Sequence, residues 1–417
     1  MAIRPGGDGD AGQPAVDIEY TLPSRPGEQE RLSYDYLINA TGPKLNFAAT
    51  PGLGPDGNSL SVCTPGHAEQ AAQALGGIVE KLRAGQRQTL VSGVGHGMCT
   101  CEGAAFEYTF NVEHELRTRG LRDLADVVYL SNEYELGDFG VGGMVFQQQG
   151  FISSSQIWTE SLFRERGVKA ILRAHVERVE PGMIYYETLD GARDALAFDF
   201  AMLLPPFRGA ALKAYDRAGA DITADLFAPS GFLKVDADYI PKPKDEWRAV
   251  DWPKTYQSPR YANVFGIGIA FAPPHGISTP RTSPNGTVIA PAPSRIGMPS
   301  AVMGRQVAHS IADMIRHGAT EPTHTASMAA MGAACIASAG AGIRNGTAAA
   351  MTMYPVVPDY DRFPVHGRSV KDTYGEIGLA AHWVKHRSTS CSSTRPRPAR
   401  AVHSCRSKEP SARSQPP

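Results

Sequence analysis

The most constraining feature of this chain is a strand, a glycine-rich turn, a helix and a second strand that follow one another between residues 86 and 131. GQRQTLVSGVGHG predicts a strand running into the turn, CEGAAFEYTFNVEHELRTRG predicts a helix that ends at Gly120, and ADVVYLS predicts the next strand. This order is the βαβ unit of a dinucleotide-binding domain. The sequence therefore predicts an α/β fold.

Further elements flank this unit on both sides. We expect helices at Ala68 to Leu82 and Ser153 to Arg166 and over MGRQVAHSIADMIRHG, and a hairpin over HVERVEPGMIYYETLDG. VDIEYTL, ERLSYDYLINA, FDFAMLLPPF and YANVFGIGIAF predict strands. These elements predict two Rossmann-like FAD/NAD(P)-binding-type domains, of which the first is incomplete. The predicted segments are a disordered start at 1–15, a partial FAD-binding domain at 16–85, a second dinucleotide-binding-like domain at 86–210, a return to the FAD domain with a C-terminal redox region at 211–386, and a disordered basic tail at 387–417.

Composition excludes several classes of protein. A formal net charge of −1 gives no basic surface for nucleic acid, and six cysteines in 417 residues do not make a small disulfide scaffold. The most apolar stretch, 326–353, contains Arg344 and Asn345, so we expect a packed interior segment and not a membrane span. MAIRPGGDGDAGQPA is polar, which favours a cytoplasmic protein or one at the inner face of the plasma membrane.

Three segments resemble the flavin-contacting turns of flavoproteins with two dinucleotide-binding domains. The strand YDYLINATGP delivers Ala40, Thr41 and Gly42, whose small side chains permit close backbone approach. VFGIGIAF brings Gly268 and Ile269 to a second turn, although the segment also fits an ordinary buried strand. RIGMPSAVMGRQVA contributes Arg295 and Gly297 before a helix.

Three further segments each carry a cysteine. They are SVCTPGHAEQA with Cys63, GMCTCEGAAFEYTF with Cys101, and AAMGAACIASAGAG with Cys335. A cysteine at the start of a helix is favoured as a thiolate by the helix dipole, which is a physical reason to place a nucleophile at Cys101. Together with the flavin segments, these three resemble sulfide:quinone oxidoreductase, a flavoprotein family.

The resemblance covers Ser33 to His386 and implies a function. It implies that Cys101 and Cys335 form the redox pair that takes up sulfide sulfur and passes electrons to FAD and then to quinone. It also implies that Cys63 handles sulfur and that His67 moves protons. Ala40, Thr41, Gly42, Gly268, Ile269, Arg295 and Gly297 would contact the flavin. Family members are peripheral membrane proteins, and the resemblance leaves a homo-oligomer open.

Alternatives remain for individual residues. Each cysteine also fits a small buried hydrophobe, and Cys99 competes with Cys101 as the reactive thiol. Cys99-x-Cys101 with His96 lacks the paired C-x-x-C spacing of a zinc site, so no metal is expected. We expect Glu102, Glu107 and Glu115 to lie on a solvated helix face.

Two departures from the family pattern bear on function. No strand, G-x-G-x-x-G turn and helix precede Tyr34, so FAD binding is an open expectation and the chain is expected to lack the family's leading βαβ portion. The tail after His386 is basic and proline-rich; it predicts either disorder or a reading-frame change near Lys385. The rival functions are a non-catalytic remnant of the family, a type II NADH dehydrogenase and a flavocytochrome c sulfide dehydrogenase.

Overall fold

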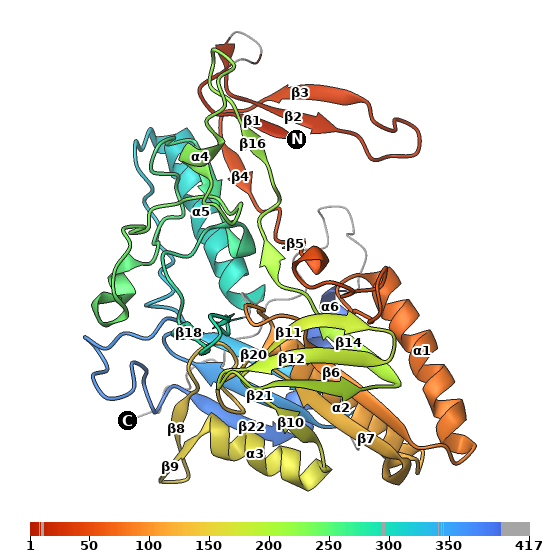
Figure 1. Cartoon of the computed structure of the whole chain (residues 1–417). Coiled ribbons are helices and arrows are strands. Elements are labelled where there is room, and N and C mark those ends of the chain that lie inside the picture. Colours follow the sequence, from red (N-terminus) through yellow and green to blue (C-terminus); the bar gives the residue numbers. More distant parts are fainter. Residues whose placement is uncertain are drawn as a thin grey trace, which may run out of the picture.

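The computed structural model describes residues 1–7, 9, 12–293, 297–340, 342, 344 and 346–392, with side chains as far as Lys385. The chain forms two lobes (Figure 1). A parallel sheet with strand order β10-β7-β6-β14 organises the larger lobe. Its elements are β6 (Gln88–Val94), β7 (Ala125–Leu130), β10 (Lys169–Ile171), β14 (Phe200–Leu204), α1 (Pro65–Arg83), α2 (Glu102–Thr118) and α3 (Ser155–Arg166). The predicted βαβ unit is therefore β6, α2 and β7.

Alternating side chains bury both faces of this sheet. On one face Leu90 and Tyr129 point into the main core around α2, and on the other Val91 and Val128 meet a second cluster. Strands β6 and β7 lie so close that a Cβ on Gly93 would sit 1.9 Å from the backbone oxygen of Leu130. The second cluster packs against the antiparallel strands β11 (Ala174–Glu180), β12 (Met183–Thr188) and β13 (Arg193–Ala197).

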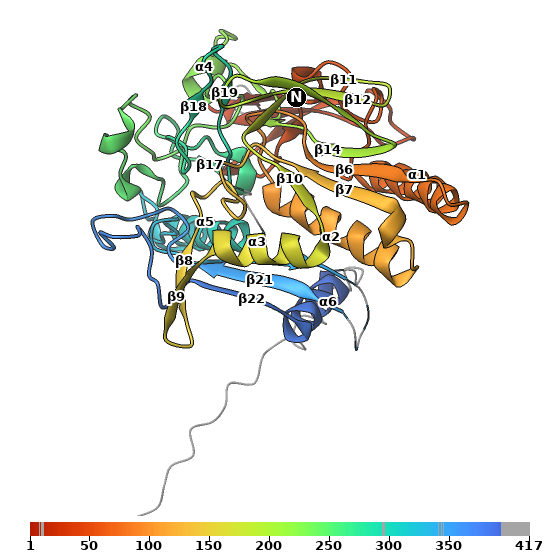
Figure 2. The ribbon, with the colours of Figure 1, turned by 60° about the horizontal axis from the view of Figure 1, so that its bottom comes forward.

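Helix α2 lies between two sheets, as Figure 2 shows from the side. One of its faces packs on β6 and β7, and another on the antiparallel sheet β20-β21-β22. Phe106 and Phe110 are fully buried, each contributing about 2–3 kcal/mol of hydrophobic stabilisation. This C-terminal sheet comprises β20 (Ala333–Ser338), β21 (Ala348–Met353) and β22 (Tyr374–Gly378), and α6 (Leu379–Ser392) covers its other face.

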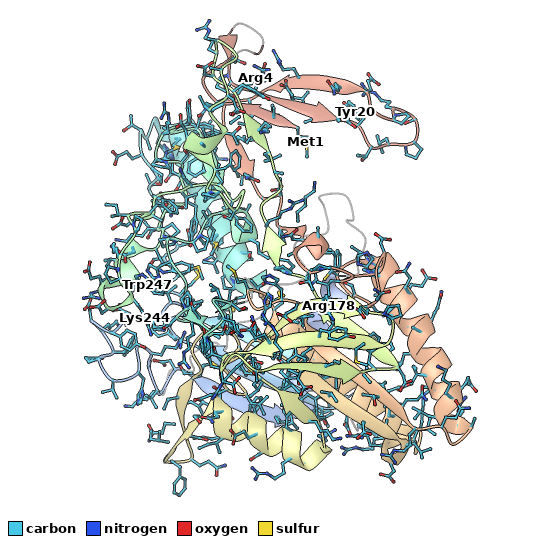
Figure 3. All side chains as sticks on the ribbon, viewed as in Figure 1. Met1, Arg4, Tyr20, Arg178, Lys244 and Trp247 are labelled. Carbon is cyan, nitrogen blue, oxygen red and sulfur yellow. The ribbon has the colours of Figure 1, made fainter. Side chains whose placement is uncertain are left out.

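The smaller lobe contains a parallel strand pair and a projecting mixed sheet. β4 (Leu37–Asn39) pairs with β17 (Val264–Gly266) in parallel, and α5 (Gly297–His317) packs beside them. Arg4 and Tyr20 lie on the projecting sheet, with strand order β16-β1-β2-β3 (Figures 1 and 3). The remaining elements are β1 (Ala2–Arg4), β2 (Ala15–Glu19), β3 (Gln29–Ser33), β5 (Lys44–Leu45), β8 (Val145–Gln148), β9 (Phe151–Ser154), β15 (Phe207–Arg208), β16 (Lys213–Ala214), α4 (Thr223–Leu226), β18 (Arg281–Thr282) and β19 (Val288–Ile289).

The structure differs from the expected elements at three places. The start was predicted to be disordered, but Ala2 to Arg4 form β1 between β2 and β16, with Ile3 buried. The expected strand ERLSYDYLINA is divided into β3 and β4, which belong to different sheets. Helix α6 continues to Ser392, beyond the predicted beginning of a disordered tail. In each case a partner segment distant in sequence supplies the packing or pairing that local pattern does not show.

Within the described residues, every helix is too short or too polar to cross a lipid bilayer.

Candidate active site at the start of helix α2

Cys101 occupies the N-cap position of α2. Its φ angle of 74° places it in the left-handed region, and its side chain forms no capping hydrogen bond to the helix. The sulfur lies 3.5 Å from the Thr100 hydroxyl oxygen, and the residue is partly exposed. The chain reaches this point through the glycine turn that follows β6, so the βαβ topology places Cys101 at the carboxyl edge of the sheet.

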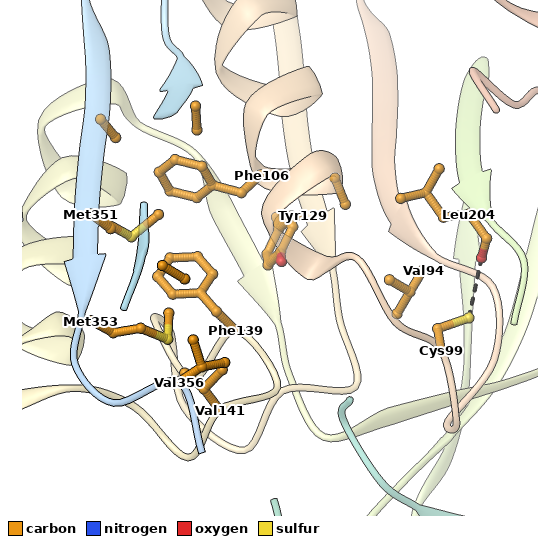
Figure 4. Close-up of a cluster of buried hydrophobic side chains, with 14 of the residues drawn as sticks. Val94, Cys99, Phe106, Tyr129, Phe139, Val141, Leu204, Met351, Met353 and Val356 are labelled. Atoms are coloured by element: carbon orange, nitrogen blue, oxygen red, sulfur yellow. Dashed lines mark hydrogen bonds between the residues drawn. The ribbon is translucent and has the colours of Figure 1, made fainter. Parts of the chain in front are cut away.

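Cys99, two residues earlier, has a different environment. Its side chain is fully buried, and its thiol donates a hydrogen bond of 3.2 Å to the backbone oxygen of Leu204 (Figure 4). Burial raises the pKa of the Cys99 thiol well above its usual value, and the charge of Glu102 adds to this effect. A buried thiol of raised pKa is a poor nucleophile, so Cys101 is the better placed of the two.

Cys335 on β20 lies against the first turn of α2. A Cβ added to Gly103 would stand 4.0 Å from the Cys335 sulfur, so the glycine leaves room for the thiol. Burial raises the pKa of Cys335, with Glu107 and Cys101 acting in the same direction and Lys385 opposing them. The structure therefore brings together two of the three predicted cysteines, from segments more than two hundred residues apart.

An ion pair from the C-terminal helix lies beside this cysteine. The Lys385 ammonium on α6 contacts the Glu107 carboxylate on α2 and donates a hydrogen bond of 2.9 Å to the backbone oxygen of Ile336. Ile336 follows Cys335 on β20, so Lys385 places a positive charge near the thiol. Sequence reasoning missed Lys385, because no local pattern connects residues 278 positions apart.

Cys63 and His67 lie at the beginning of α1. Burial raises the pKa of Cys63, and its backbone N–H is bonded to the Ser61 hydroxyl. The Thr64 side chain caps the helix by accepting from the His67 N–H. The buried Nδ1 of His67 has no hydrogen-bond partner among the described residues. The His67 ring also meets the Phe47 ring edge-on, and none of the contacts described for Cys63 and His67 reaches Cys335.

The predicted flavin-contacting turns meet at one edge of the smaller lobe. β4 and β17 are parallel neighbours, so their carboxyl ends deliver Gly42 and Gly268 to the same edge. Both glycines have positive φ angles, 67° and 64°, and an added Cβ on Gly42 would meet no atom within 4 Å. Thr41 is held in the turn by hydrogen bonds from its N–H and hydroxyl to Asn39, and Ile269 follows Gly268 in a short 3-10 turn.

These residues fit the ring system of FAD. No described residue is assigned to its pyrophosphate. Gly297, the first residue of α5, is exposed, and Gly268 packs toward Ser300 in the first turn of that helix. At Gly42 the edge of β4 and β17 therefore has open space on the side where a side chain would project. Among the described residues before Tyr34, the strands are antiparallel and no helix N-terminus is available for a pyrophosphate. Arg295 lies outside the described residues.

An apolar cavity of about 60 Å³ connects the cysteine to α5. Gly103 and Cys335 form one wall, and Pro299, Ser300 and Met303 from α5 form another. Figure 4 shows Phe139, Val141 and Met351 in the packing that surrounds it. The cavity lies between the Cys335 thiol and α5, the helix that follows the predicted flavin edge.

Buried carboxyl groups lie beneath the start of α2, contrary to our expectation of a solvated face. Glu102 is 0% exposed, and neither of its carboxyl oxygens has a hydrogen-bond partner among the described residues. Burial raises the pKa of Glu102 well above its usual value, and the charge of Glu133 raises it further. Glu107 and Glu115 are partly exposed.

Glu133 follows β7 and is also fully buried. It accepts hydrogen bonds from the Tyr129 hydroxyl at 2.6 Å, the Ser131 hydroxyl at 2.9 Å and the Phe139 N–H at 2.8 Å. Burial raises the pKa of Glu133 to about 7 despite these bonds. No local pattern in the sequence singles out Glu133, because the burial of its carboxyl group depends on α2 and the loop after β7.

The titration of Glu133 predicts how stability depends on pH. Because the folded-state pKa is raised, the folded chain binds a proton that the unfolded chain has released, and stability falls as pH rises from about 5 to about 7. Glu133→Gln should flatten this decline by up to about 1.4 kcal/mol per pH unit, measured by urea denaturation. Glu115→Gln is the matched control, and equal slopes in both variants would contradict the prediction.

The glycine turn after β6 is occupied by side chains of the chain itself. The Gly97 N–H donates to His175 Nδ1 at 3.1 Å, and the Asn132 amide donates to the backbone oxygens of Gly97 and Cys99 at 3.1 and 3.2 Å. An added Cβ on Gly95 would lie 2.4 Å from Leu53. Backbone groups of this turn that a dinucleotide would contact are therefore already bonded or covered.

Comparison with known proteins supports the resemblance found in the sequence. No protein-family profile matches the chain. Sulfide-quinone reductase of Aquifex aeolicus (strain VF5) is 31% identical over 288 residues, which make up 69% of this chain and 56% of that protein. The chain thus matches little more than half the length of this curated relative.

The comparison of folds agrees with the comparison of sequences. The X-ray structure of the sulfide:quinone oxidoreductase from the hyperthermophilic bacterium Aquifex aeolicus superimposes with a TM-score of 0.65 and 26% sequence identity, over 94% of this chain and 72% of that one. The predicted α/β fold with Rossmann-like domains is confirmed by this likeness and by the sheet order of the larger lobe. In sequence and in fold, the chain is a relative of the sulfide:quinone oxidoreductases.

Proposed function

We propose that the chain is an oxidoreductase that oxidises sulfide through Cys101 and Cys335 and passes the electrons by way of FAD to a quinone. The observation that carries this proposal is the position of Cys335 beside the first turn of α2, close enough for Cys101 to influence its pKa. The kinship with sulfide:quinone oxidoreductases supports the substrate and acceptor.

The chemistry at the cysteines is thiol–disulfide exchange. Hydrosulfide attacks one sulfur of a Cys101–Cys335 disulfide, the S–S bond breaks, a new S–S bond forms to the sulfide sulfur, and the other cysteine leaves as a thiolate. Lys385, whose charge opposes the raised pKa of Cys335, stabilises negative charge on that sulfur. Bound FAD would accept the two electrons released when sulfide sulfur is oxidised.

The binding of the flavin is proposed at the edge formed by β4 and β17. Ala40, Thr41, Gly42, Gly268, Ile269 and Gly297 would hold its ring system there, with Arg295 assigned by the resemblance alone. We assign Cys63 and His67 an accessory role in sulfur and proton handling at the beginning of α1. Association with a membrane surface at the cytoplasmic face, and assembly into oligomers, belong to the same proposal.

The domain organisation is also proposed from sequence and fold together. Residues 16–85 and 211–386 would form the flavin lobe and the redox region, and 86–210 the second dinucleotide-type domain. The bonded glycine turn at Gly97 disfavours the NADH-oxidising alternative. The remaining alternatives are a non-catalytic remnant of the family and a flavocytochrome c sulfide dehydrogenase.

The test is a visible spectrum of the purified chain with added FAD, followed by anaerobic titration with sulfide and then with a short-chain quinone. We expect a bound flavin spectrum that bleaches with sulfide and recovers with quinone. Bleaching by NADH and not by sulfide would favour the NADH-oxidising alternative. A flavin that does not bind would show that the chain is a remnant without this activity.

A further inference from the structure

Sulfur-bearing residues line much of the apolar cavity between Cys335 and α5. Besides Cys335 itself, they are Met144, Met303, Met328, Met351 and Met353. Each of these methionines is at most 9% exposed, and all belong to the main buried core cluster, against which Cys335 packs. They come from parts of the chain that are distant in sequence, so no local spacing predicts the group.

The strand register places three of these residues on one face of the C-terminal sheet. Cys335 on β20 is the cross-strand partner of Met351 on β21, and Met353 lies two positions further along, opposite Ala333. Residues two apart share a face of a strand, and residues directly opposite have Cβ atoms about 4.5–5.5 Å apart. Figure 4 shows Met351 and Met353 projecting to the same side of β21. The flexible Met351 side chain is therefore within reach of the Cys335 sulfur.

The other methionines reach the cavity from outside this sheet. Met303 lies on α5. The Met144 N–H donates to the Ser155 hydroxyl at 2.9 Å, and the Met328 backbone oxygen accepts from the Val357 N–H at 3.1 Å. Methionine commonly fills gaps in a core, yet here a space of about 60 Å³ beside a thiol is left unfilled. A water-sized guest needs only about 10–15 Å³, so the space accommodates a metal ion.

We propose that this cavity is a binding site for a soft monovalent metal ion, and for Cu(I) above all. The ligands from the sheet are the Cys335 thiolate and the thioethers of Met351 and Met353. Met303 supplies a further thioether from α5. Thiolate and thioether sulfur select Cu(I), whereas carboxylate and carbonyl oxygens suit harder ions.

The charges around the cavity favour a monovalent ion. Cu(I) and a thiolate together are neutral, so an apolar wall tolerates them, whereas a divalent ion would keep an uncompensated positive charge. No charged residue lines the described cavity, and the nearby Glu107 carboxylate is paired with Lys385. Across the described part of the chain, no three His, Cys, Asp or Glu side chains gather so as to hold a metal ion, which leaves sulfur as the ligand type this chain offers.

Binding is a ligand exchange without electron transfer. The Cys335 S–H bond breaks and its proton passes to solvent, a Cu–S bond forms, and Cu(I) leaves the ligand that delivered it. Only a free thiol can bind in this way, and Cys335 is free in this structure. Where Cys335 acts in sulfide oxidation as proposed, the bound ion blocks that sulfur; this consequence alone rests on the proposed function.

The test is an anaerobic titration of the flavin-free chain with Cu(I) supplied as its bicinchoninate complex. All variants carry serine at Cys63, Cys391 and Cys405, so that these thiols do not compete. We expect transfer of a single Cu(I) ion to the chain, the ultraviolet band of a Cu(I)–thiolate bond and a raised Tm. The band and the transfer should be lost in Cys335→Ser.

Leucine substitutions separate this site from binding by cysteines alone. Leucine is close to methionine in volume, so Met351→Leu and Met303→Leu should remain folded. Each should weaken Cu(I) binding by about tenfold or more, because a ligand is lost. Met314→Leu is the matched control: Met314 is also buried on α5 but lies outside the cavity wall, and its replacement should leave the affinity unchanged.

Three results would overturn the proposal: no transfer of Cu(I) from bicinchoninate, unchanged affinity in both Met351→Leu and Met303→Leu, or equal weakening in Met314→Leu. Weaker binding in Cys101→Ser with no effect of the leucine variants would place the ion between the two cysteines and overturn it as well. Circular dichroism checks that each variant is folded. Because neither flavin nor sulfide is present, failure here is distinct from failure of the proposed function, which the FAD and sulfide titration reports.

Discussion

Replacing Cys335 by serine is expected to abolish sulfide-dependent reduction of the flavin and formation of a disulfide with Cys101. The serine hydroxyl cannot form the S–S bond that receives the sulfide sulfur. Because Ser is close in size to Cys, the packing of β20 against Gly103 should survive. The measurements are anaerobic bleaching of the FAD-loaded chain by sulfide and peptide mapping after mild oxidation.

The matched control is Cys99→Ser. The serine hydroxyl keeps a donor for the backbone oxygen of Leu204 in a fully buried position, so sulfide oxidation should persist. Loss of bleaching in Cys99→Ser with retention in Cys101→Ser would instead identify Cys99 as the reactive thiol. Retention of full bleaching in Cys335→Ser would contradict the proposed cysteine pair.

Replacing Arg368 by methionine is expected to lower the free energy of unfolding by about 3–5 kcal/mol. Arg368 is 5% exposed and donates to the backbone oxygens of Val141, Gly143, Pro355 and Val356 at 3.1 to 3.2 Å. Methionine would leave these buried oxygens without donors. Urea denaturation followed by circular dichroism measures the loss.

Loss of the Arg368 hydrogen bonds should also disturb the candidate active site, because the four backbone oxygens belong to the loop after β7 and to the segment after β21. Arg368 thereby ties the buried carboxyl groups to the sheet that carries Cys335. Arg83→Met is the control: that guanidinium forms an exposed ion pair with Glu80, and its loss should cost less than about 1 kcal/mol. Similar effects of the two substitutions would contradict the assigned role of Arg368.

Local pattern predicted the larger lobe well. The helical spacing of apolar residues predicts Ala68 to Leu82, and the helix spans Pro65 to Arg83 with Thr64 as its N-cap. The βαβ unit of β6, α2 and β7 follows from strand, glycine turn and helix signals over about 45 residues. These signals are readable because each depends on hydrogen bonds and burial within a short segment.

The same reasoning failed where a partner lies far along the chain. β1 exists because β2 and β16 pair with it on either side. Helix α6 packs on β21, which composition after His386 does not reveal. The tail beyond Ser392, predicted to be disordered, lies outside the described residues.

The sequence by itself determined the α/β class, the order of the flavin and cysteine segments, and the family to which they point. Only the tertiary structure decided that Cys99 is buried while Cys101 is partly exposed, that Glu102 lies inside, and that Lys385 bonds the backbone oxygen of Ile336 next to Cys335. Periodicity and turn chemistry are local, whereas burial and pKa depend on which distant segments pack around a side chain. The sequence identifies the cysteines that can react. The C-terminal sheet β20-β21-β22, together with the segments that pack on it, determines their environment.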